Sequence, residues 1–500
     1  MRKTLFIKNA LILTVTGIIL RFLGIVFKIW LAGKVGAEGI GLYHLVFSVY
    51  TLLATFASSG ITVAVTRLCV NEITLGTKHG LKKLIRRSFA IVIIISLFSL
   101  FITLFGSEFI ALKIIGDVRS EESIAIFGFS LPFMGISAVL KGYFTARRKI
   151  GTNSIAVLLE QAVRIALCLY FVGIFSQKGI GMAVAGVILG DTIAEMVSCI
   201  FSYICYRLDL KKVNCDGNSA QFSKTKEILR ISSPITLGRY CTSLLRTAEN
   251  IIMPKALHKS GGLYSRSLSL FGSLKGMALP VLFFPSSVLN AFSTLLIPEM
   301  SEALVKKQPK IIKKDVERSI KLTLIIGIIF GGIFFFGGTR IGNLIYGDAD
   351  SGYLIKVLAP LTPLMYCDCI ADGILKGLDQ QNFTFRVSVG DSILRIILIS
   401  IFVPLTSING FISIMYLSNI LTFFLNFLKL IKVTGAKIRI INEIFFPLTL
   451  SAAVCSISFI ILNKISADLI FVSAYTLLSI ILYFGTIYFS DNNFKGLFSI

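Results

Sequence analysis

The stretch NALILTVTGIILRFLGIVFKIWLAG, residues 9–33, decides the fold because it is long and apolar yet carries charges. About 20 apolar residues are enough to cross the hydrocarbon core of a bilayer. Arg21 lies at the middle of the stretch and Lys28 lies two turns later. A charge at the bilayer centre costs roughly 3 kcal/mol on insertion scales, so it normally faces a partner or a water-filled cavity. The stretch therefore predicts a transmembrane helix that lines a cavity, and we expect that cavity to hold an anion.

The composition of the whole chain is that of an integral membrane protein. Of its 500 residues, 55% are hydrophobic and only 15% are charged, and its mean hydropathy is +0.83. Soluble domains contain about 25% charged residues. Long apolar runs recur from end to end, so we predict an all-α fold without a large soluble domain. The basic start MRKTLFIK and the long apolar run behind it predict a retained first helix.

Apolar windows of about 20 residues predict the membrane spans. We expect about 14 of them, at residues 9–32, 40–66, 88–106, 123–146, 154–175, 180–206, 228–253, 270–300, 320–338, 354–375, 384–404, 409–431, 443–462 and 467–489.

The cations lie in alternate loops, and this alternation predicts the orientation. Lys and Arg gather near 1–8, 78–87, 147–149, 207–230, 306–321 and 429–439, whereas the loops between these regions hold few. Positively charged loops stay in the cytoplasm, so both termini are predicted to be cytoplasmic. The clusters account for the net charge of +24 and suit anionic membrane lipids, so a nucleic-acid partner is not expected.

Two segments of the chain share an ordered set of features. Residues 140–167, LKGYFTARRKIGTNSIAVLLEQAVRIAL, resemble residues 375–398, LKGLDQQNFTFRVSVGDSILRIIL. Each begins with Leu-Lys-Gly and places an acid four residues before an arginine. A second similarity relates SSGITVAVTRLCVNE (58–72) to STLLIPEMSEAL (293–304). Together they indicate a repeated unit of six helices.

An even-numbered unit repeats with the same orientation in the membrane, so its copies are related by a pseudo-two-fold axis along the membrane normal. We predict a first lobe at 1–222 with spans 1–6, a second lobe at 223–432 with spans 7–12, and two extra spans at 433–500. Two such lobes would enclose a cleft. Pro280, Pro285 and Pro298 fall in one span, as is typical of helices that bend beside a cavity.

Several motifs resemble the stage V sporulation protein B group of polysaccharide and lipid-linked oligosaccharide exporters. They are Arg21-Phe-Leu-Gly24, GAEGIGLYHLVFSVY (36–50), SSGITVAVTR (58–67) and KGMALPVLFFPSSVLNAFSTLLIPEMSEA (275–303). The resemblance covers most of the chain. It implies the multidrug, oligosaccharidyl-lipid and polysaccharide exporter superfamily, in which two six-helix lobes alternate between inward-open and outward-open states.

The resemblance also implies a substrate. The group is associated with spore-cortex peptidoglycan, so we expect an undecaprenyl-pyrophosphate-linked saccharide that is flipped to the outer leaflet of a bacterial plasma membrane. Related lipid II flippases carry two further helices, as the span count here does. They commonly carry a second arginine just before the position of Lys28, where this chain has Phe27. Lysine supplies a charge at this place but lacks the planar fork that binds phosphate through two hydrogen bonds.

Cationic residues within the spans are the candidates for binding the diphosphate. Arg21 and Lys28 are seven residues apart and share one helix face, although Lys28 could instead extend to the membrane surface. Span 7 contributes Arg239, Arg246 and Glu249, and Glu249 could neutralise Arg246. Arginine matches phosphate oxygens well. The predicted head-group residues are Arg21, Lys28, Arg246 and Lys275.

Acidic residues within the spans have two possible roles. Glu160 with Arg164, and Asp391 with Arg395, have the i, i+4 spacing of structural ion pairs on helices. Asp191 and Glu195 have the same spacing but like charges, which would favour binding of a proton or sodium ion. The predicted ion-coupling residues are Asp191, Glu195, Asp368 and Asp372.

The repeat alignment matches Arg67 at the inner end of span 2 with Glu302 at the inner end of span 8. Opposite charges at equivalent places in facing lobes suggest an inner gate.

Two alternative functions stay open. Uncompensated acids in the cleft would favour a cation-coupled exporter of small drugs, and a third possibility is a scaffold for cell-wall synthesis enzymes. An enzyme is not expected, because His44, His79 and His258 are scattered and the nine cysteines lack metal-ligand spacing. No cofactor motif is present, and the sequence leaves the oligomeric state open.

Overall fold

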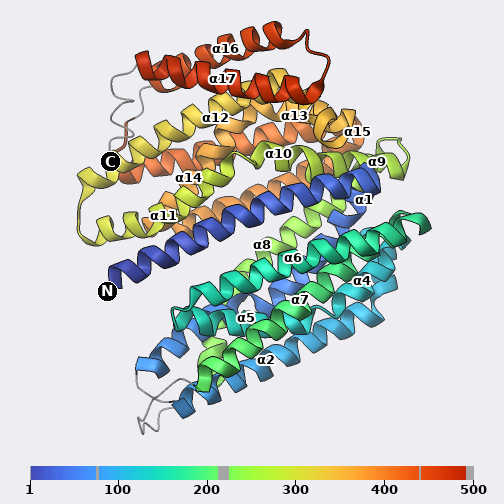
Figure 1. Ribbon diagram of the computed structural model, residues 1–500, viewed down its shortest axis with the longest axis vertical. Coiled ribbons are helices and arrows are strands. Elements are labelled where there is room, and N and C mark those ends of the chain that lie inside the picture. The colour runs from blue at the N-terminus through green and yellow to red at the C-terminus, as the bar shows by residue number, and fades with distance from the viewer. Residues whose placement is uncertain (1, 75–77, 212–224, 438–440, 491–500) are drawn as a thin grey trace. The chain divides into compact units, whose positions relative to one another are not determined.

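The computed structural model describes residues 2–74, 78–211, 225–437 and 441–490, and these residues are helical with no strand among them (Figure 1). The α-helices are α1 (Arg2–Thr74), α2 (Lys78–Phe105), α3 (Ser107–Phe109), α4 (Glu121–Gly128), α5 (Leu131–Ala146), α6 (Ile150–Phe175), α7 (Ile180–Lys211), α8 (Thr225–Lys259), α9 (Tyr264–Gly272), α10 (Leu279–Phe283), α11 (Ser286–Val305), α12 (Pro309–Tyr346), α13 (Ala349–Leu358), α14 (Thr362–Gly377), α15 (Gln381–Thr434), α16 (Phe446–Leu462) and α17 (Asp468–Ser490). Short 3₁₀ and π turns complete them: η1 (Ile110–Ile115), η2 (Val118–Ser120), η3 (Ser176–Lys178), η4 (Ser273–Ala278), η5 (Ala359–Leu361) and η6 (Ile441–Phe445). The predicted all-α membrane fold is confirmed.

Several predicted spans share one helix or break into several. Helix α1 contains two spans that join at Gly36, whose φ of 69° suits a residue without a side chain. Helix α15 contains two spans that join at Ser407. The predicted span 270–300 is instead divided into α9, η4, α10 and α11, and it begins at Tyr264. Among the described residues, nine helices are long and apolar enough to cross a membrane, or ten if the bent α4–α5 pair counts as one span.

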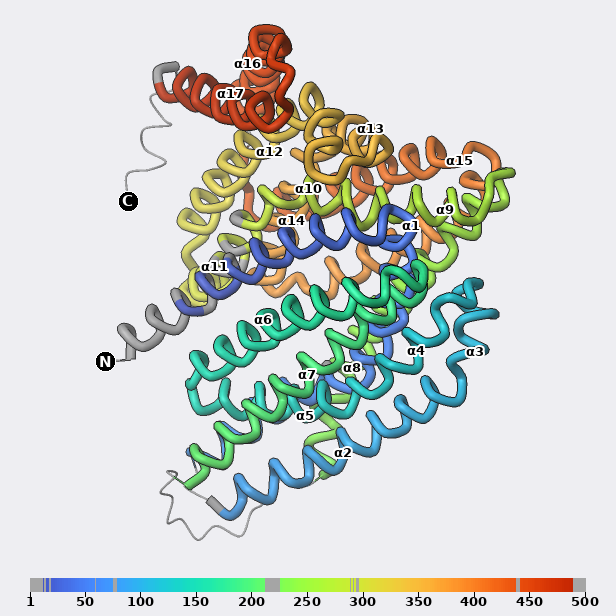
Figure 2. The backbone as a smooth tube through the Cα atoms, turned by 45° about the vertical axis from the view of Figure 1, so that its right-hand side comes forward, coloured from blue at the N-terminus to red at the C-terminus, as the bar shows by residue number. Residues whose placement is uncertain are grey.

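The chain forms two compact units, residues 1–251 and 252–500. In the first unit α5 contacts α1 and α2, and α6 lies along α7 (Figure 2). Helix α8 belongs to the first unit up to Ile251, although the sequence predicts that the second lobe starts at 223. The predicted boundary at 222 and 223 lies at the edge of residues 212–224, outside the described residues, and the lobe assignment stays a prediction.

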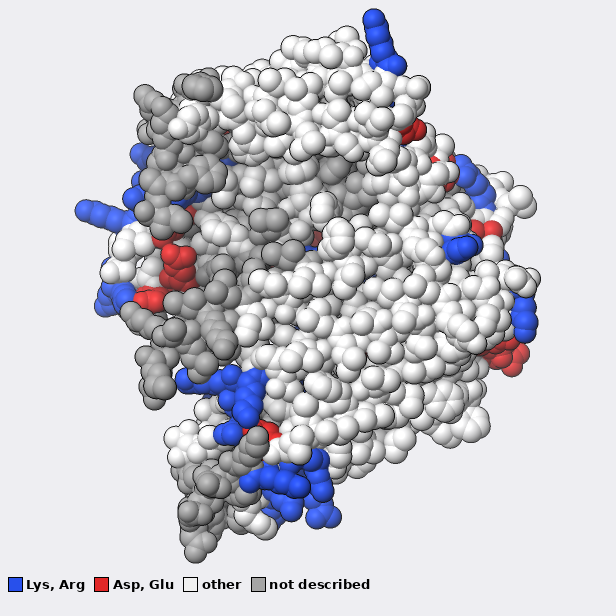
Figure 3. All heavy atoms as spheres, viewed as in Figure 1, with Lys and Arg blue, Asp and Glu red and all other residues white. Residues whose placement is uncertain are grey.

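Helix α2 has an exposed face of large apolar residues, which suits contact with lipid, and a buried face of small polar residues that packs against protein. One face exposes five large apolar side chains, each at least 50% accessible: Ile94, Leu97, Phe98, Phe101 and Phe105. The opposite face buries small polar residues, Ser88, Ser96, Ser99 and Thr103. Their hydroxyls donate to carbonyls of their own helix, as Ser96 does to Val92, so neighbouring helices approach closely without an unpaired donor. In Figure 3, Lys and Arg gather toward the helix ends and uncharged side chains cover the surface between them.

The repeated Leu-Lys-Gly motif has the same packing role in both units. A Cβ on Gly142 of α5 would lie 2.8 Å from the carbonyl oxygen of Thr62 in α1. A Cβ on Gly377 of α14 would lie 2.8 Å from the carbonyl oxygen of Ile297 in α11. Only glycine permits these backbones to approach so closely. The predicted internal repeat therefore corresponds to an equivalent helix crossing within each unit.

A second pair of equivalent segments stands at the ends of the spans, GDVRS (116–120) and GDADS (347–351). In both, the glycine has positive φ and the serine hydroxyl donates to the aspartate carbonyl, at 2.6 Å from Ser120 and 2.8 Å from Ser351. Both aspartates cap the helical turn that follows, Asp117 before η2 and Asp348 before α13. These segments are too short to stand out as a repeat in the sequence alone.

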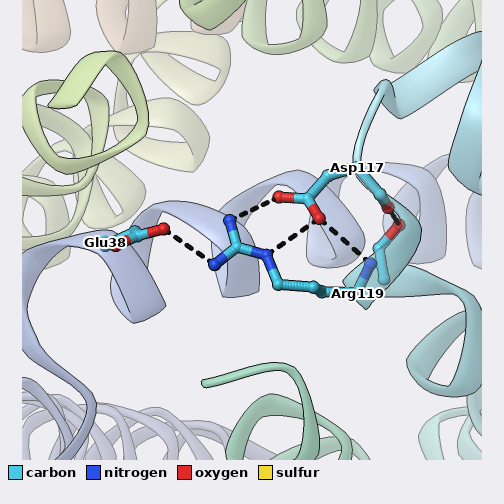
Figure 4. A network of polar contacts seen from close by, with 4 residues as sticks. Glu38, Asp117 and Arg119 are labelled. Atoms are coloured by element: carbon cyan, nitrogen blue, oxygen red, sulfur yellow. Dashed lines mark hydrogen bonds and ion pairs between the residues drawn. The ribbon is translucent and has the colours of Figure 1, made fainter. Parts of the chain in front are cut away.

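The fourth residue of each segment forms an ion pair. This residue is the cation of the pair in the first unit and the anion of the pair in the second unit. In the first unit Arg119 bonds Asp117, and its Nη1 lies 2.7 Å from Glu38 Oε1 near the kink in α1 (Figure 4). In the second unit Asp350 occupies the equivalent place and bonds Arg266 of α9, with Nη2 2.9 Å from Oδ1. Each pair holds the segment against the start of a neighbouring helix.

Removing the guanidinium of Arg119 tests what this contact contributes. Arg119→Ala is expected to lower the free energy of unfolding of the protein in micelles by about 1 kcal/mol, because the pair is partly solvated. Arg119→Lys should recover only part of the loss, since an ammonium cannot span both carboxylates. Denaturant titration measures both variants, and an unchanged midpoint in Arg119→Ala would contradict the role given to this ion pair.

The two C-terminal helices pack on α12 through its glycines. A Cβ on Gly337 would lie 2.7 Å from Cε1 of Tyr475 in α17, and one on Gly332 would lie 2.3 Å from Oγ of Ser451 in α16. Tyr475 stacks on Phe471, and the guanidinium of Arg340 lies 4.2 Å from the Phe471 ring centroid. The same helices expose Ile460, Leu469 and Ile481 by 60% or more, as a lipid-facing surface requires.

Helix α8 crosses α1 at Gly60 in the first unit. The Gly60 amide donates to Thr236 Oγ1 at 3.1 Å, and a Cβ here would lie 2.2 Å from the Ser232 carbonyl oxygen. Because that oxygen belongs to a helix backbone, a methyl group would force the helices apart. Gly60→Ala is therefore expected to lower the free energy of unfolding by about 1–3 kcal/mol.

The matched control for this change is Gly173→Ala in α6. A Cβ on Gly173 meets nothing within 4 Å, so alanine there should leave stability unchanged or raise it slightly. The same denaturant titration compares the two variants. Equal denaturation midpoints for Gly60→Ala and Gly173→Ala would contradict the close approach of α1 and α8 at Gly60.

Candidate substrate-binding cavity

A cavity of about 930 Å³ lies within the first unit. Helix α1 lines it from Tyr43 to Val63, and α8 lines it from Arg239 to Asn250. The other walls come from α5, α6 and α7. Two contacts attach α8 to α1 near one end of this wall, where Thr247 Oγ1 donates to the Ser48 carbonyl at 3.0 Å and Asn250 Nδ2 donates to Ser48 Oγ at 2.9 Å. The Gly60 crossing attaches the helices again further along, and the arginines of α8 lie between.

The α8 wall is a polar face that repeats with the helical period. The lining residues are Arg239, Thr242, Ser243, Arg246, Thr247 and Asn250, at positions i, i+3, i+4, i+7, i+8 and i+11. Both arginines are exposed within the structure, so their guanidinium groups reach solvent. Hydroxyl and amide groups between the arginines add further donors. This face therefore offers charged and neutral hydrogen-bond donors to an anion.

The wall formed by α6 and α7 carries a buried cluster of charges. Arg164 Nη2 lies 2.7 Å from Glu160 Oε1, and Arg164 Nε lies 2.5 Å from Asp191 Oδ1. The carboxylates are nearly buried, with 12% and 9% of their side chains exposed. Glu195 is also buried and lines the same cavity with Lys141 of α5. One guanidinium thus compensates two carboxylates from neighbouring helices.

Aromatic rings of α1 form the third wall. Tyr43, Phe47 and Tyr50 follow one another along the helix, with ring centroids 5.5 Å apart in each successive pair. The ring of Tyr50 continues to Phe127 of α4 at 5.4 Å, and its hydroxyl contacts Met134 Sδ at 3.0 Å. These rings give the cavity an apolar surface beside its charged ones.

The predicted head-group residues occupy different places. Arg246 lines the cavity. Arg21 is exposed and Lys28 is half-buried on the first half of α1, and neither is among the lining residues. Lys275 is half-buried in the η4 turn of the second unit. The structure therefore does not gather these four residues in the cavity of the first unit, and their shared role stays a prediction.

The predicted ion-coupling residues divide between the units. Asp191 and Glu195 both line the cavity of the first unit, where Asp191 pairs with Arg164. In the second unit, Asp368 accepts a hydrogen bond of 2.7 Å from Asn426 Nδ2, and Asp372 pairs with Lys376 one turn along α14.

The remaining predicted residues have the following neighbours. Asp391 accepts a hydrogen bond from Ser418 Oγ, while its pairing with Arg395 stays a prediction. Arg67 lines a separate pocket of about 650 Å³ with Glu227 and Arg230. Glu302 of α11 pairs with Lys306, which directly follows the helix. The predicted gate would join the two units and also stays a prediction.

Sequence reasoning missed several cavity residues. Lys141 belongs to the Leu-Lys-Gly repeat but was not singled out as a lining cation, and Arg239 was noted without a role. The helical spacing of the α8 hydroxyls with its arginines could have shown the whole face. No local sequence pattern indicates the pairing of Arg164 with Asp191, because the two residues lie on different helices.

Solved structures with the same fold are transporters. The chain superposes on "Lipid II flippase MurJ, inward closed conformation" with a TM-score of 0.71 at 12% identity, covering 95% of this chain and 98% of that chain. It superposes on an inward-facing multidrug resistance MATE family transporter of the MOP superfamily with a TM-score of 0.66 at 15% identity, covering 84% and 96%. The fold is thus that of a multi-pass membrane transporter.

The sequence family follows from a match to the model of the polysaccharide biosynthesis proteins over residues 6–304. Because this match covers more than half of the chain, the protein belongs to the polysaccharide biosynthesis protein family. Stage V sporulation protein B of Bacillus subtilis is 28% identical over 384 residues, 76% of this chain and 74% of that protein. Lipid II flippase MurJ of the same organism is 20% identical over 472 residues, 89% and 86% of the two chains.

Proposed function

We propose that the protein moves an undecaprenyl-pyrophosphate-linked saccharide from the cytoplasmic to the outer leaflet by alternating access, with both termini in the cytoplasm. The observation that carries the proposal is the α8 face, where Arg239 and Arg246 line a cavity within a membrane protein of this family. A diphosphate in a low-dielectric cavity needs cationic donors, and arginine supplies them in a fork that matches phosphate oxygens.

The charge distribution of the cavity supports an anionic substrate. Its acids lie on α6 and α7, and Arg164 compensates two of them. The α8 face contributes two further cations, Arg239 and Arg246, to the lining of the cavity. The aromatic rings of α1 supply apolar surface for the saccharide. Arg21, Lys28 and Lys275 would meet the diphosphate at other stages of transport. A peptidoglycan precursor, such as one for the spore cortex, is the substrate that the relatives favour.

A second candidate is a cation-coupled exporter of small molecules, which the buried acids of the cavity favour. It predicts that neutralising Asp191, Glu195, Asp368 and Asp372 abolishes transport while the arginines of α8 are dispensable. Under the leading proposal the same acids couple transport to an ion gradient, so their loss slows flipping without removing substrate binding.

A reconstituted flipping assay tests the proposal. Purified protein in vesicles, with a fluorescent lipid-linked saccharide in the inner leaflet and a controlled membrane potential, is expected to expose that lipid outside faster than protein-free vesicles do. No acceleration at any potential or ion gradient would contradict transport. In cells, complementation by a variant locked shut would favour the scaffold function with cell-wall synthesis enzymes.

A further inference from the structure

An apolar groove of about 240 Å³ lies beside the cavity, between α1, α2 and α8 of the first unit. Phe56 and Ile61 line it from α1, Ile91 and Ile95 from α2, and Leu229 and Tyr240 from α8. Its polar lining residues are Ser58, Ser232, Ser233, Thr236 and Tyr240. A groove of this chemistry suits a hydrocarbon chain.

The groove adjoins the cavity. Ser58 lines both of them, and Ala54 and Thr55 on the cavity side are close neighbours of Phe56 on the groove side. On α8 the groove residue Tyr240 directly follows the cavity residue Arg239. Successive residues of a helix are about a quarter turn apart. The cation of Arg239 and the groove therefore lie on adjacent faces of α8.

The two ends of the groove differ. The crossing of Gly60 with Ser232 closes the space between α1 and α8. The outer rim consists of exposed side chains, since Phe56 is 40% exposed, Leu229 45% and Leu237 70%. The rings of Phe56 and Tyr240 lie 5.5 Å apart and join the two helices at the rim. The groove thus lies between the cation-lined cavity and the exposed surface of the first unit.

We propose that this groove holds the part of the polyprenyl chain next to the diphosphate while the head group occupies the cavity. The inference rests on the proposed function. Guanidinium groups alone would bind any anion, and the groove alone would bind any hydrocarbon. A single ligand that fills both places must therefore carry an anionic group and a hydrocarbon chain. A polyprenyl diphosphate carries its anion and its apolar chain on adjacent atoms, as the cavity and the groove are adjacent.

Bulky residues at the open rim test the groove with little disturbance of the core. Ser233 and Leu237 line the groove and are exposed, so Ser233→Trp and Leu237→Trp should fold. Each variant is expected to weaken binding of polyprenyl diphosphate about tenfold by displacing the first isoprene unit. Binding of inorganic diphosphate should be unchanged. Leu244→Trp is the matched control, since Leu244 is an exposed α8 residue outside the groove.

A photoreactive group on the first isoprene unit locates the chain directly in the wild-type protein. Crosslinks to peptides of α1, α2 and α8 that contain groove residues are expected. Two results would overturn the proposal that the groove holds the polyprenyl chain, provided that inorganic diphosphate still binds. They are crosslinks confined to other helices, and full affinity for the lipid in both tryptophan variants. If neither the lipid nor inorganic diphosphate binds the wild-type protein, the proposed function itself fails.

Discussion

Replacing both cavity arginines of α8, Arg239→Ala with Arg246→Ala, is expected to reduce affinity for the lipid-linked diphosphate at least about a hundredfold. Each hydrogen-bonded guanidinium contributes roughly 1.5–3 kcal/mol to an anion that is held in the cavity. Arg246→Lys should lose less, because it keeps the charge but not the planar fork. Flipping rates at substrate concentrations below saturation should fall in the same order. Equilibrium binding and vesicle assays measure the two effects.

The control for this prediction is Arg230→Ala. Arg230 lies on the same helix but lines the separate pocket with Arg67 and Glu227. Its removal lowers the net charge by one, as each single arginine change does, and should leave affinity within about twofold of the wild type, since distant surface charges are screened. Wild-type affinity in the double variant would contradict a head-group role for α8, and an equal loss in Arg230→Ala would show that overall charge is responsible.

Arg164→Ala is expected to cause a large loss of stability, about 3 kcal/mol in the free energy of unfolding. The change leaves the carboxylates of Glu160 and Asp191 buried without their shared cation, and breaking a buried pair is costly because the remaining charge stays desolvated. Removing all three charges with Glu160→Gln, Arg164→Gln and Asp191→Asn should restore most of the stability. Unfolding in micelles, followed by circular dichroism, provides the measurement.

An exposed ion pair serves as the comparison for Arg164. Lys306 pairs with Glu302 at the same i, i+4 spacing, but more than half of each side chain is exposed. Lys306→Ala should therefore cost less than about 1 kcal/mol. If Arg164→Ala costs no more than Lys306→Ala, the cluster contributes nothing beyond a surface pair. If the triple variant stays as unstable as Arg164→Ala, packing and not charge explains the loss.

The membrane fold could be predicted from the sequence because bilayer thickness sets the length of an apolar helix. The repeat could be predicted because Gly142 and Gly377 make equivalent close crossings, and such crossings require glycine. The kinks were harder to predict. Ser407 has a φ of 56° within an apolar run, and nothing in the local sequence demands a left-handed residue three positions after Pro404.

The candidate site could be predicted only in part. Arg246 was recognisable as a charge within a span, and its helical neighbours extend the same face. Arg21 satisfies the same rule but is not among the residues that line the cavity. A single sequence shows that a charge is intramembrane and does not show which neighbour it meets. For the same reason the contact between Arg164 and Asp191, which joins α6 to α7, could not be derived from spacing.

The most direct measurement is an experimental structure of the protein in nanodiscs that contain saturating polyprenyl diphosphate. The account predicts phosphate density within hydrogen-bond distance of Arg239 and Arg246, in the cavity between α1, α6, α7 and α8. Density for the diphosphate at any other place, with this cavity filled only by water, would contradict it.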